Sequence, residues 1–253
     1  MGWYEFMVKG VGVPMFRHIL HARLTNAEVI PAQGPAILAA NHRGGMDVLV
    51  VAGLIDRRIV YPAKAELFEG RGIKRLMAWW LRSMGQIPID REAGQGGAQG
   101  LRPLVDVLRA GGLVGIFPEG TRSPDGRLYR GHTGVARLAL ATGAPVIPVG
   151  MSHTHVHAGR FGLPTMRDAQ IVFGQPMDFS ALASQQGDAD VVRQVTDAVM
   201  ASIQRITGQA YVDVYASQVK KGLVDAAALR SLERAHPGDH ALPSGPTGDE
   251  GAS

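Results

Sequence analysis

Short apolar runs alternate with amphipathic segments along most of the chain. Residues 36–40 (AILAA) and 113–117 (LVGIF) are continuous apolar runs of strand length, which predicts buried strands. Residues 73–84 and 189–206 instead carry apolar side chains at helical spacing, so each is predicted to form a helix with one buried face. The same reading predicts further strands at 59–62, 86–89, 145–149 and 169–173, and further helices at 47–54, 101–110 and 134–141. Alternating strands and helices favour an α/β fold, a layered and largely parallel sheet flanked by helices.

The two ends of the chain have different patterns. Residues 1–25 mix aromatic and aliphatic side chains with cations, which is typical of an amphipathic segment at a membrane interface, although a short helix packed on the domain fits as well. The last 18 residues, 236–253, are rich in Pro, Gly and Ser and are predicted to be disordered. We find no run of about 20 apolar residues that predicts a transmembrane helix, and no secretory signal pattern.

Composition and charge narrow the possible partners. The chain has 253 residues, 45% of them hydrophobic, and no cysteine, which excludes disulfides and thiolate catalysis. Residues 57–91 hold eight Lys or Arg and three acids, so this stretch favours an anionic partner: phosphate, CoA, lipid head groups or nucleic acid. Charge alone does not choose among these. No helix-turn-helix, zinc-finger or RNA-recognition pattern supports nucleic acid, which we do not expect as a partner.

A histidine and an aspartate follow the first buried run. His42 and Asp47 stand five positions apart in NHRGGMD (41–47), where a strand is predicted to turn into a helix. On a continuous helix the two side chains would diverge, but at such a turn they can converge. A carboxylate that accepts a hydrogen bond from one imidazole nitrogen leaves the other free to act as a general base. By itself the pair is also typical of a structural contact.

Three more segments follow in order. GQIPIDR (85–91) ends a predicted strand on Arg91, FPEGTRS (117–123) is a loop with a second cation, and APVIPV (144–149) is an apolar strand. A guanidinium at the carboxyl edge of a sheet can hold a phosphate through two hydrogen bonds. Taken singly, Arg91 is more typical of a surface arginine paired with Asp90 or Glu92, and the 117–123 loop is more typical of an ordinary surface turn.

The order of the four segments is the specific signal. The chain resembles the glycerolipid acyltransferase superfamily, whose best-known members acylate lysophosphatidic acid and which shows NHxxxxD, GxIxxxR, FPEGTRS and a VPIIPV-like strand in this order. The resemblance extends from about residue 30 to about 215 and includes PAKAELF (62–68) and TGQAYVDVYA (207–216). It places the catalytic domain at 26–215, before a helical extension at 216–235, and implies the glycerolphosphate acyltransferase fold.

The resemblance also implies residue roles. His42 would deprotonate the acceptor hydroxyl, Asp47 would orient His42, and attack would fall directly on the thioester with no acyl-enzyme. The acceptor phosphate would be bound by residues of the motifs and a nearby lysine: Arg91, Arg122, Glu119, Gly120, Thr121 and Lys64. No cofactor and no metal are implied, and the co-substrate is acyl-CoA or acyl carrier protein.

The reaction implied is acyl transfer to the sn-2 hydroxyl of lysophosphatidic acid, giving phosphatidic acid. Because the product is a membrane lipid, we expect a peripheral enzyme on the cytoplasmic face of the cell membrane. The alternatives are a sister acyltransferase with another glycerolipid or glycolipid acceptor and a catalytically silent lipid-binding relative. Intact His42 and Asp47 argue against the silent relative.

The chain departs from the family pattern at two positions. Position 44 is Gly where the family commonly has Ser or Thr, and position 132 is His where close relatives often have Lys. Separately, His153, His155 and His157 alternate and on a single strand would share one face, which suits a metal. The resemblance implies no metal there, and no site is expected.

Overall fold

The structure, a computed structural model, describes residues 22–69, 72–83, 85–89, 100–154, 157–158, 164–165 and 168–238. Of the expected N-terminal membrane segment, residues 1–21 lie outside the described residues, and so do residues 239–253 of the expected tail.

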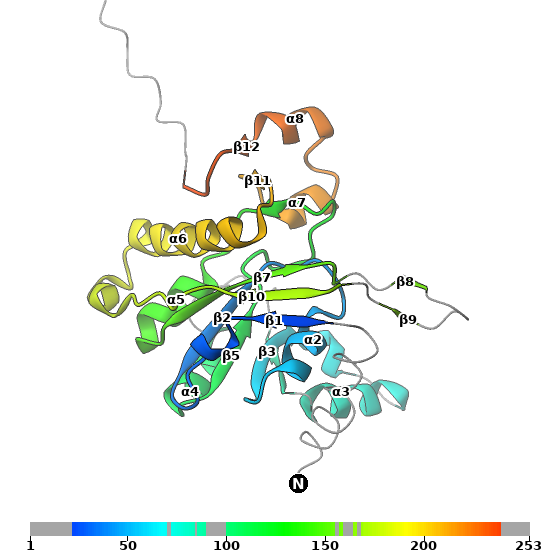
Figure 1. Cartoon of the computed structure of the whole chain (residues 1–253), viewed down its shortest axis with the longest axis vertical. Helices are drawn as coiled ribbons and strands as arrows, with labels where there is room; N and C mark the ends of the chain where they lie inside the picture. The colour runs from blue at the N-terminus through cyan, green and yellow to red at the C-terminus, as the bar shows by residue number, and fades with distance from the viewer. Residues whose placement is uncertain are drawn as a thin grey trace, which may run out of the picture.

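A seven-stranded sheet forms the centre of the molecule (Figure 1). Its strands, in spatial order, are β1 (Arg23–Thr25), β10 (Gln170–Phe173), β7 (Val146–Ser152), β2 (Ala36–Ala40), β5 (Leu113–Ile116), β3 (Ile59–Lys64) and β4 (Gln86–Ile89). All neighbouring pairs are parallel except β10 with β7. The predicted largely parallel sheet is therefore confirmed.

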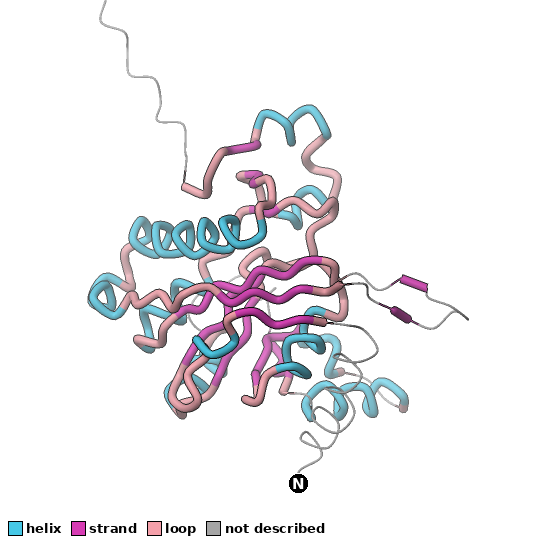
Figure 2. The backbone as a smooth tube through the Cα atoms, viewed as in Figure 1, coloured by secondary structure: helices cyan, strands magenta, loops and turns pink. Residues whose placement is uncertain are grey.

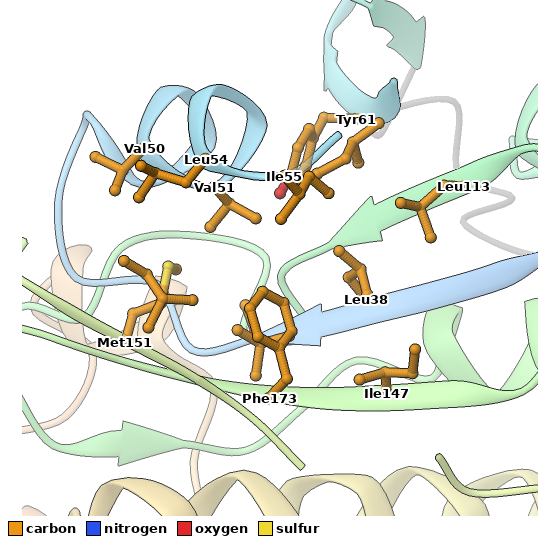
Figure 3. Close-up of a cluster of buried hydrophobic side chains, with 14 of the residues drawn as sticks. Leu38, Val50, Val51, Leu54, Ile55, Tyr61, Leu113, Ile147, Met151 and Phe173 are labelled. Atoms are coloured by element: carbon orange, nitrogen blue, oxygen red, sulfur yellow. The ribbon is translucent and has the colours of Figure 1, made fainter. Parts of the chain in front are cut away.

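Helices cover both faces of this sheet because successive residues of a buried strand point to opposite sides. Leu38 packs in a cluster with Val50, Val51 and Leu54 of α2 (Asp47–Leu54), and Figure 3 shows these side chains between the helix and the sheet. Its neighbour Ile37 packs in a second cluster on the other face. The helices that contribute to that cluster are α4 (Arg102–Arg109), α5 (Gly134–Thr142) and α6 (Ala189–Thr207).

The long helix α6 shows why the sequence pattern located the elements well. Asp188 caps it by accepting from the backbone N–H groups of Asp190 and Val191, and Gly208 ends it in the left-handed conformation. The helix runs alongside β7 (Figure 2). Its apolar face is buried, as the helical spacing predicts.

A smaller helical unit projects beside β4. It comprises η4 (Ala65–Phe68) and α3 (Ile73–Ser83), and three of its large apolar side chains are half-exposed: Leu67, Leu76 and Trp79. Elsewhere in the fold, two short 3₁₀ helices contact other elements: η3 (Ala27–Val29) contacts β10, and η6 (Ser180–Gln185) contacts α5. Strands β8 (His157–Ala158) and β9 (Pro164–Thr165) form a separate antiparallel pair. Within the part of the chain that the structure describes, no helix is both long and apolar enough to cross a bilayer.

The C-terminal region returns to the segment that follows β5, where it forms a small three-stranded sheet. Strand β11 (Tyr211–Val212) pairs with β6 (Leu128–Tyr129) on one side and with β12 (Glu233–Arg234) on the other. Helices α7 (Ala216–Lys220) and α8 (Ala226–Ser231) lie between β11 and β12 in sequence. A buried cluster joins them to the main domain: Tyr129, Val212, Val214, Ala216 and Leu229.

Candidate active site

The first and third sequence motifs meet because the strands that precede them run in the same direction. Strands β2 and β5 pair in parallel, with Ala39 opposite Ile116, so the segments after them emerge at the same edge of the sheet. Ligand sites of α/β proteins lie at this carboxyl edge. A direct bond ties the two segments together, since the Ser123 N–H donates to the His42 carbonyl at 2.8 Å.

The side chains of His42 and Asp47 do converge at the turn between β2 and α2. The His42 Nδ1 and Asp47 Oδ2 atoms are 2.8 Å apart. The same carboxylate oxygen accepts from the backbone N–H groups of Arg43, at 2.7 Å, and Gly44, at 2.8 Å. Asp47 is fully buried, whereas the His42 side chain is partly exposed. The carboxylate therefore fixes both the turn and the imidazole, and Nε2 of His42 is the ring nitrogen left to exchange a proton.

Phe117 supports the imidazole from the third motif. Its ring stacks on His42 with centroids 4.0 Å apart and an interplanar angle of 17°. Tyr61 of β3 stacks in turn on Phe117, at 5.7 Å. Three neighbouring parallel strands thus hold the orientation of His42.

Asn41 has a supporting role that the sequence did not predict. Its Oδ1 accepts from the Met151 N–H at 2.7 Å, while Nδ2 donates to the Met151 carbonyl at 2.9 Å and to Gln209 Oε1 at 2.8 Å. Gln209 in turn donates to the carbonyl of Gly126 at 2.6 Å. The amide therefore ties the end of β2 to β7 and to the segment after α6.

Glu119 is buried beneath the site. Its two carboxylate oxygens accept from the backbone N–H groups of His42, at 3.0 Å, and Tyr129, at 3.2 Å. Burial, the largest cause, and the nearby Asp47 charge together raise the pKa of Glu119 to about 8, despite these two bonds. The sequence reading grouped Glu119 with the phosphate ligands, but the structure places it where it supports the His42 backbone.

Gly120 shows why the third motif needs a glycine. Its φ of 72° is left-handed, and a Cβ there would lie 2.9 Å from the ring of His132. The His132 ring stacks on Tyr215, with centroids 4.3 Å apart. A side chain at position 120 would therefore push against the His132 ring, which stacks on Tyr215 of the C-terminal segment.

A cleft of about 760 Å³ opens beside the turn that carries His42. It is lined by two motif segments and by one residue of α7: Arg43, Gly44, Gly45, Met46, Arg122, Ser123, Pro124 and Lys220. Arg122, predicted to bind phosphate, is exposed here, and Lys220 Nζ donates to Thr121 Oγ1 at 3.0 Å. No sequence motif pointed to Lys220.

Gly44 itself leaves no space for a side chain. A Cβ at this position would be 2.8 Å from the carbonyl oxygen of Thr154 and 3.3 Å from Asp47 Oδ1. The backbone at the end of β7 approaches the turn closely, which explains why this chain has Gly at the position. At Gly45 the nearest atom to such a Cβ is Arg122 Nη1, at 3.8 Å.

The remaining predicted residues are placed less fully. Arg91 lies outside the described residues. Lys64 is the last residue of β3, and only the backbone of Lys64 is described. His153 is exposed after the end of β7, with a φ of 57°, so the three histidines do not share one continuous strand, and His155 lies outside the described residues. Among the described residues no group of three His, Cys, Asp or Glu could hold a metal ion.

Comparisons with known proteins agree with this arrangement. The profile of the family described as Acyltransferase matches residues 21–152. The chain is 30% identical over 169 residues to the 1-acyl-sn-glycerol-3-phosphate acyltransferase of Bacillus subtilis, covering 65% of this chain and 79% of that protein. It is 27% identical over 190 residues to the Streptococcus pneumoniae protein of the same name, covering 74% of this chain and 66% of that protein. The solved structure of the 1-acyl-sn-glycerophosphate acyltransferase PlsC from Thermotoga maritima has the same fold, with a TM-score of 0.53, 24% identity, and coverage of 74% and 71% of the two chains.

Proposed function

This chain belongs to the acyltransferase family, and we propose that it transfers an acyl chain from a thioester to the sn-2 hydroxyl of lysophosphatidic acid, giving phosphatidic acid. The observation that carries the proposal is the buried Asp47 carboxylate held 2.8 Å from His42 Nδ1, beside a cleft lined by cations. The two bacterial relatives described above are named as acyltransferases that act on the same acceptor. The thioester donor in this proposal is acyl-CoA or acyl carrier protein.

The proposed mechanism uses one base in both directions. His42 Nε2 takes the proton of the sn-2 hydroxyl while the hydroxyl oxygen forms a bond to the thioester carbonyl carbon. The carbonyl π electrons move to its oxygen, and their return breaks the carbon–sulfur bond. The departing thiolate then takes the proton back from His42. Asp47 stabilises the imidazolium that exists between these steps, because its carboxylate lies 2.8 Å from Nδ1, the ring nitrogen opposite Nε2.

The acceptor phosphate is proposed to bind in the cleft. Arg122 reaches it from the third motif, while Arg91 and Lys64, the last residue of β3, stay predicted ligands. A guanidinium favours a phosphate monoester, since it offers paired donors and a permanent charge. A sister enzyme with an uncharged acceptor would gain nothing from these cations.

We further propose that the unit of η4 and α3 contacts the membrane from which the acceptor comes. Leu76 and Trp79 on α3 are 58% and 51% exposed, and Leu67 of η4 is 50% exposed. Exposed cations accompany them on α3 (Lys74, Arg75 and Arg82). Apolar side chains beside cations suit the surface of an anionic bilayer.

Labelled acyl-CoA offered to the purified protein in liposomes tests the function. Lysophosphatidic acid, glycerol 3-phosphate and lysophosphatidylcholine would be compared as acceptors, each also with acyl carrier protein as donor. We expect turnover with lysophosphatidic acid, a loss of at least about a thousandfold in His42→Ala and a similar loss in Asp47→Asn. His153→Asn is the matched control, because it removes an exposed histidine and tolerates the left-handed backbone. Turnover that survives His42→Ala would disprove the mechanism, and turnover confined to another acceptor would replace the substrate.

A further inference from the structure

Three cations from separate parts of the chain line the cleft beside His42. Arg43 follows β2, Arg122 follows β5, and Lys220 ends α7. Among the described residues, none of the three forms a salt bridge with a carboxylate. Glu119 acts on Arg43 and Lys220 from a distance, without a direct ion pair. Three cations that line one cleft favour a bound anion.

Lys220 is held in this position by the packing of its segment. Ala216, at the start of α7, is buried in the cluster with Tyr129 and Val212, which fixes the helix against the small sheet. At the other end of the helix, Lys220 Nζ donates to Thr121 Oγ1 at 3.0 Å. An ammonium has two further N–H donors, and these remain for a ligand in the cleft.

The electrostatics of Lys220 agree with this geometry. Lys220 is exposed, and its slight desolvation and then the neighbouring Arg122 charge lower its pKa, while the Glu119 charge acts in the opposite direction.

We infer that Lys220, supplied by the C-terminal segment, binds the phosphate monoester of the acceptor and makes the enzyme selective for acceptors that carry one. This inference rests on the proposed function. The alternative source of phosphate is the CoA donor. In the acceptor only two carbon atoms separate the reacting hydroxyl from the phosphate ester oxygen, whereas the pantetheine arm keeps the CoA phosphates far from the thioester. Because the cleft adjoins the turn of His42, its cations suit the acceptor.

Steady-state kinetics of the full chain test this assignment. Lys220→Gln removes the charge, Lys220→Arg keeps it, and Lys221→Gln is the matched control, since Lys221 is an exposed neighbour outside the cleft lining. KM and kcat would be measured separately for lysophosphatidic acid, for monoacylglycerol as an acceptor without phosphate, and for acyl-CoA.

We expect Lys220→Gln to raise the KM for lysophosphatidic acid about tenfold with little change in kcat, and to lower the preference over monoacylglycerol by the same factor. Lys220→Arg should restore most of the affinity, and Lys221→Gln should behave as the unaltered enzyme. A raised KM for acyl-CoA instead, equal effects in the two Gln variants, or a loss of kcat alone would overturn the inference.

A binding measurement separates this inference from the proposed function. If the unaltered enzyme turns over no acceptor, the proposed function fails, and calorimetry with a short-chain lysophosphatidic acid then decides about Lys220. Weaker binding to Lys220→Gln than to Lys221→Gln supports the phosphate site. Equal binding to both refutes it.

Discussion

Gly44 offers a sharp test of the proposed catalytic turn. A Cβ there would lie 2.8 Å from the backbone oxygen of Thr154, well inside van der Waals contact, and 3.3 Å from Asp47 Oδ1. Thr154 is fully buried after the end of β7, so its carbonyl has little freedom to retreat. The Gly44 N–H also donates to Asp47 Oδ2 at 2.8 Å. Any shift of this residue therefore disturbs the carboxylate that orients His42.

We expect Gly44→Ala to lower both stability and activity. Overpacking costs about 1–3 kcal/mol, and the loss of glycine flexibility in the unfolded chain offsets about 0.4–1 kcal/mol of that. The net loss of about 1–2 kcal/mol corresponds to a fall in Tm of roughly 2–8 °C for a domain of this size. The value of kcat should fall at least about tenfold, because errors of around 1 Å in catalytic geometry cost about a hundredfold.

The neighbouring glycine is the control. At Gly45 a Cβ would meet only Arg122 Nη1, at 3.8 Å, so Gly45→Ala should leave Tm within about 1 °C of the unaltered protein. Differential scanning fluorimetry of the two variants measures the difference. Equal Tm changes in both, or none in Gly44→Ala, would show that the approach of Thr154 is not the constraint on this position.

Two further predictions concern burial and membrane contact. Burial raises the pKa of Glu119 to about 8 from a usual 4.5, so the folded protein binds this proton more tightly than the unfolded chain does. The protonated side chain therefore stabilises the fold fully below about pH 4.5, and this stabilisation is lost as the pH rises through 8. Glu119→Gln removes this titration. Chemical denaturation at pH 5 and pH 8.5 should show that the unfolding free energy falls more between these two pH values in the unaltered protein than in Glu119→Gln, by a few kcal/mol. Equal falls in the two proteins would contradict this prediction. Leu76→Glu should weaken sedimentation with anionic vesicles at least about tenfold, while Leu223→Glu, at a 70% exposed site in the C-terminal segment, should not; equal losses would remove α3 from the interface.

The longer elements could be predicted from the sequence because their patterns are local. The bounds predicted for β2 and α2 match the structure, and those of α6 differ by one residue. Strands β1, β6, β11 and β12 were not predicted. Each has two or three residues, too few to show a period, and each depends on partners distant in the chain.

The site was predictable as a set of motifs, but not as a set of contacts. The turn chemistry predicted that His42 and Asp47 could converge, and the structure brings them together. It did not predict the bonds of Asn41 to Met151, because these join residues 110 positions apart. Nor could the sequence show that Glu119 points inward to the backbone of His42, since side-chain directions in an irregular loop follow no period.

The C-terminal segment meets the 117–123 loop at two places. The His132 ring stacks on Tyr215 and lies close to Gly120, so His132 supports the 117–123 loop. Lys220, at the end of α7, reaches the same loop and donates a hydrogen bond to Thr121, which follows Gly120. The buried cluster joins residues of the main domain, such as Tyr129 and Val212, to Ala216 and Leu229 of the C-terminal segment. Tyr215 and Lys220 thus both come to the loop from a segment that this cluster packs against β6 and β11.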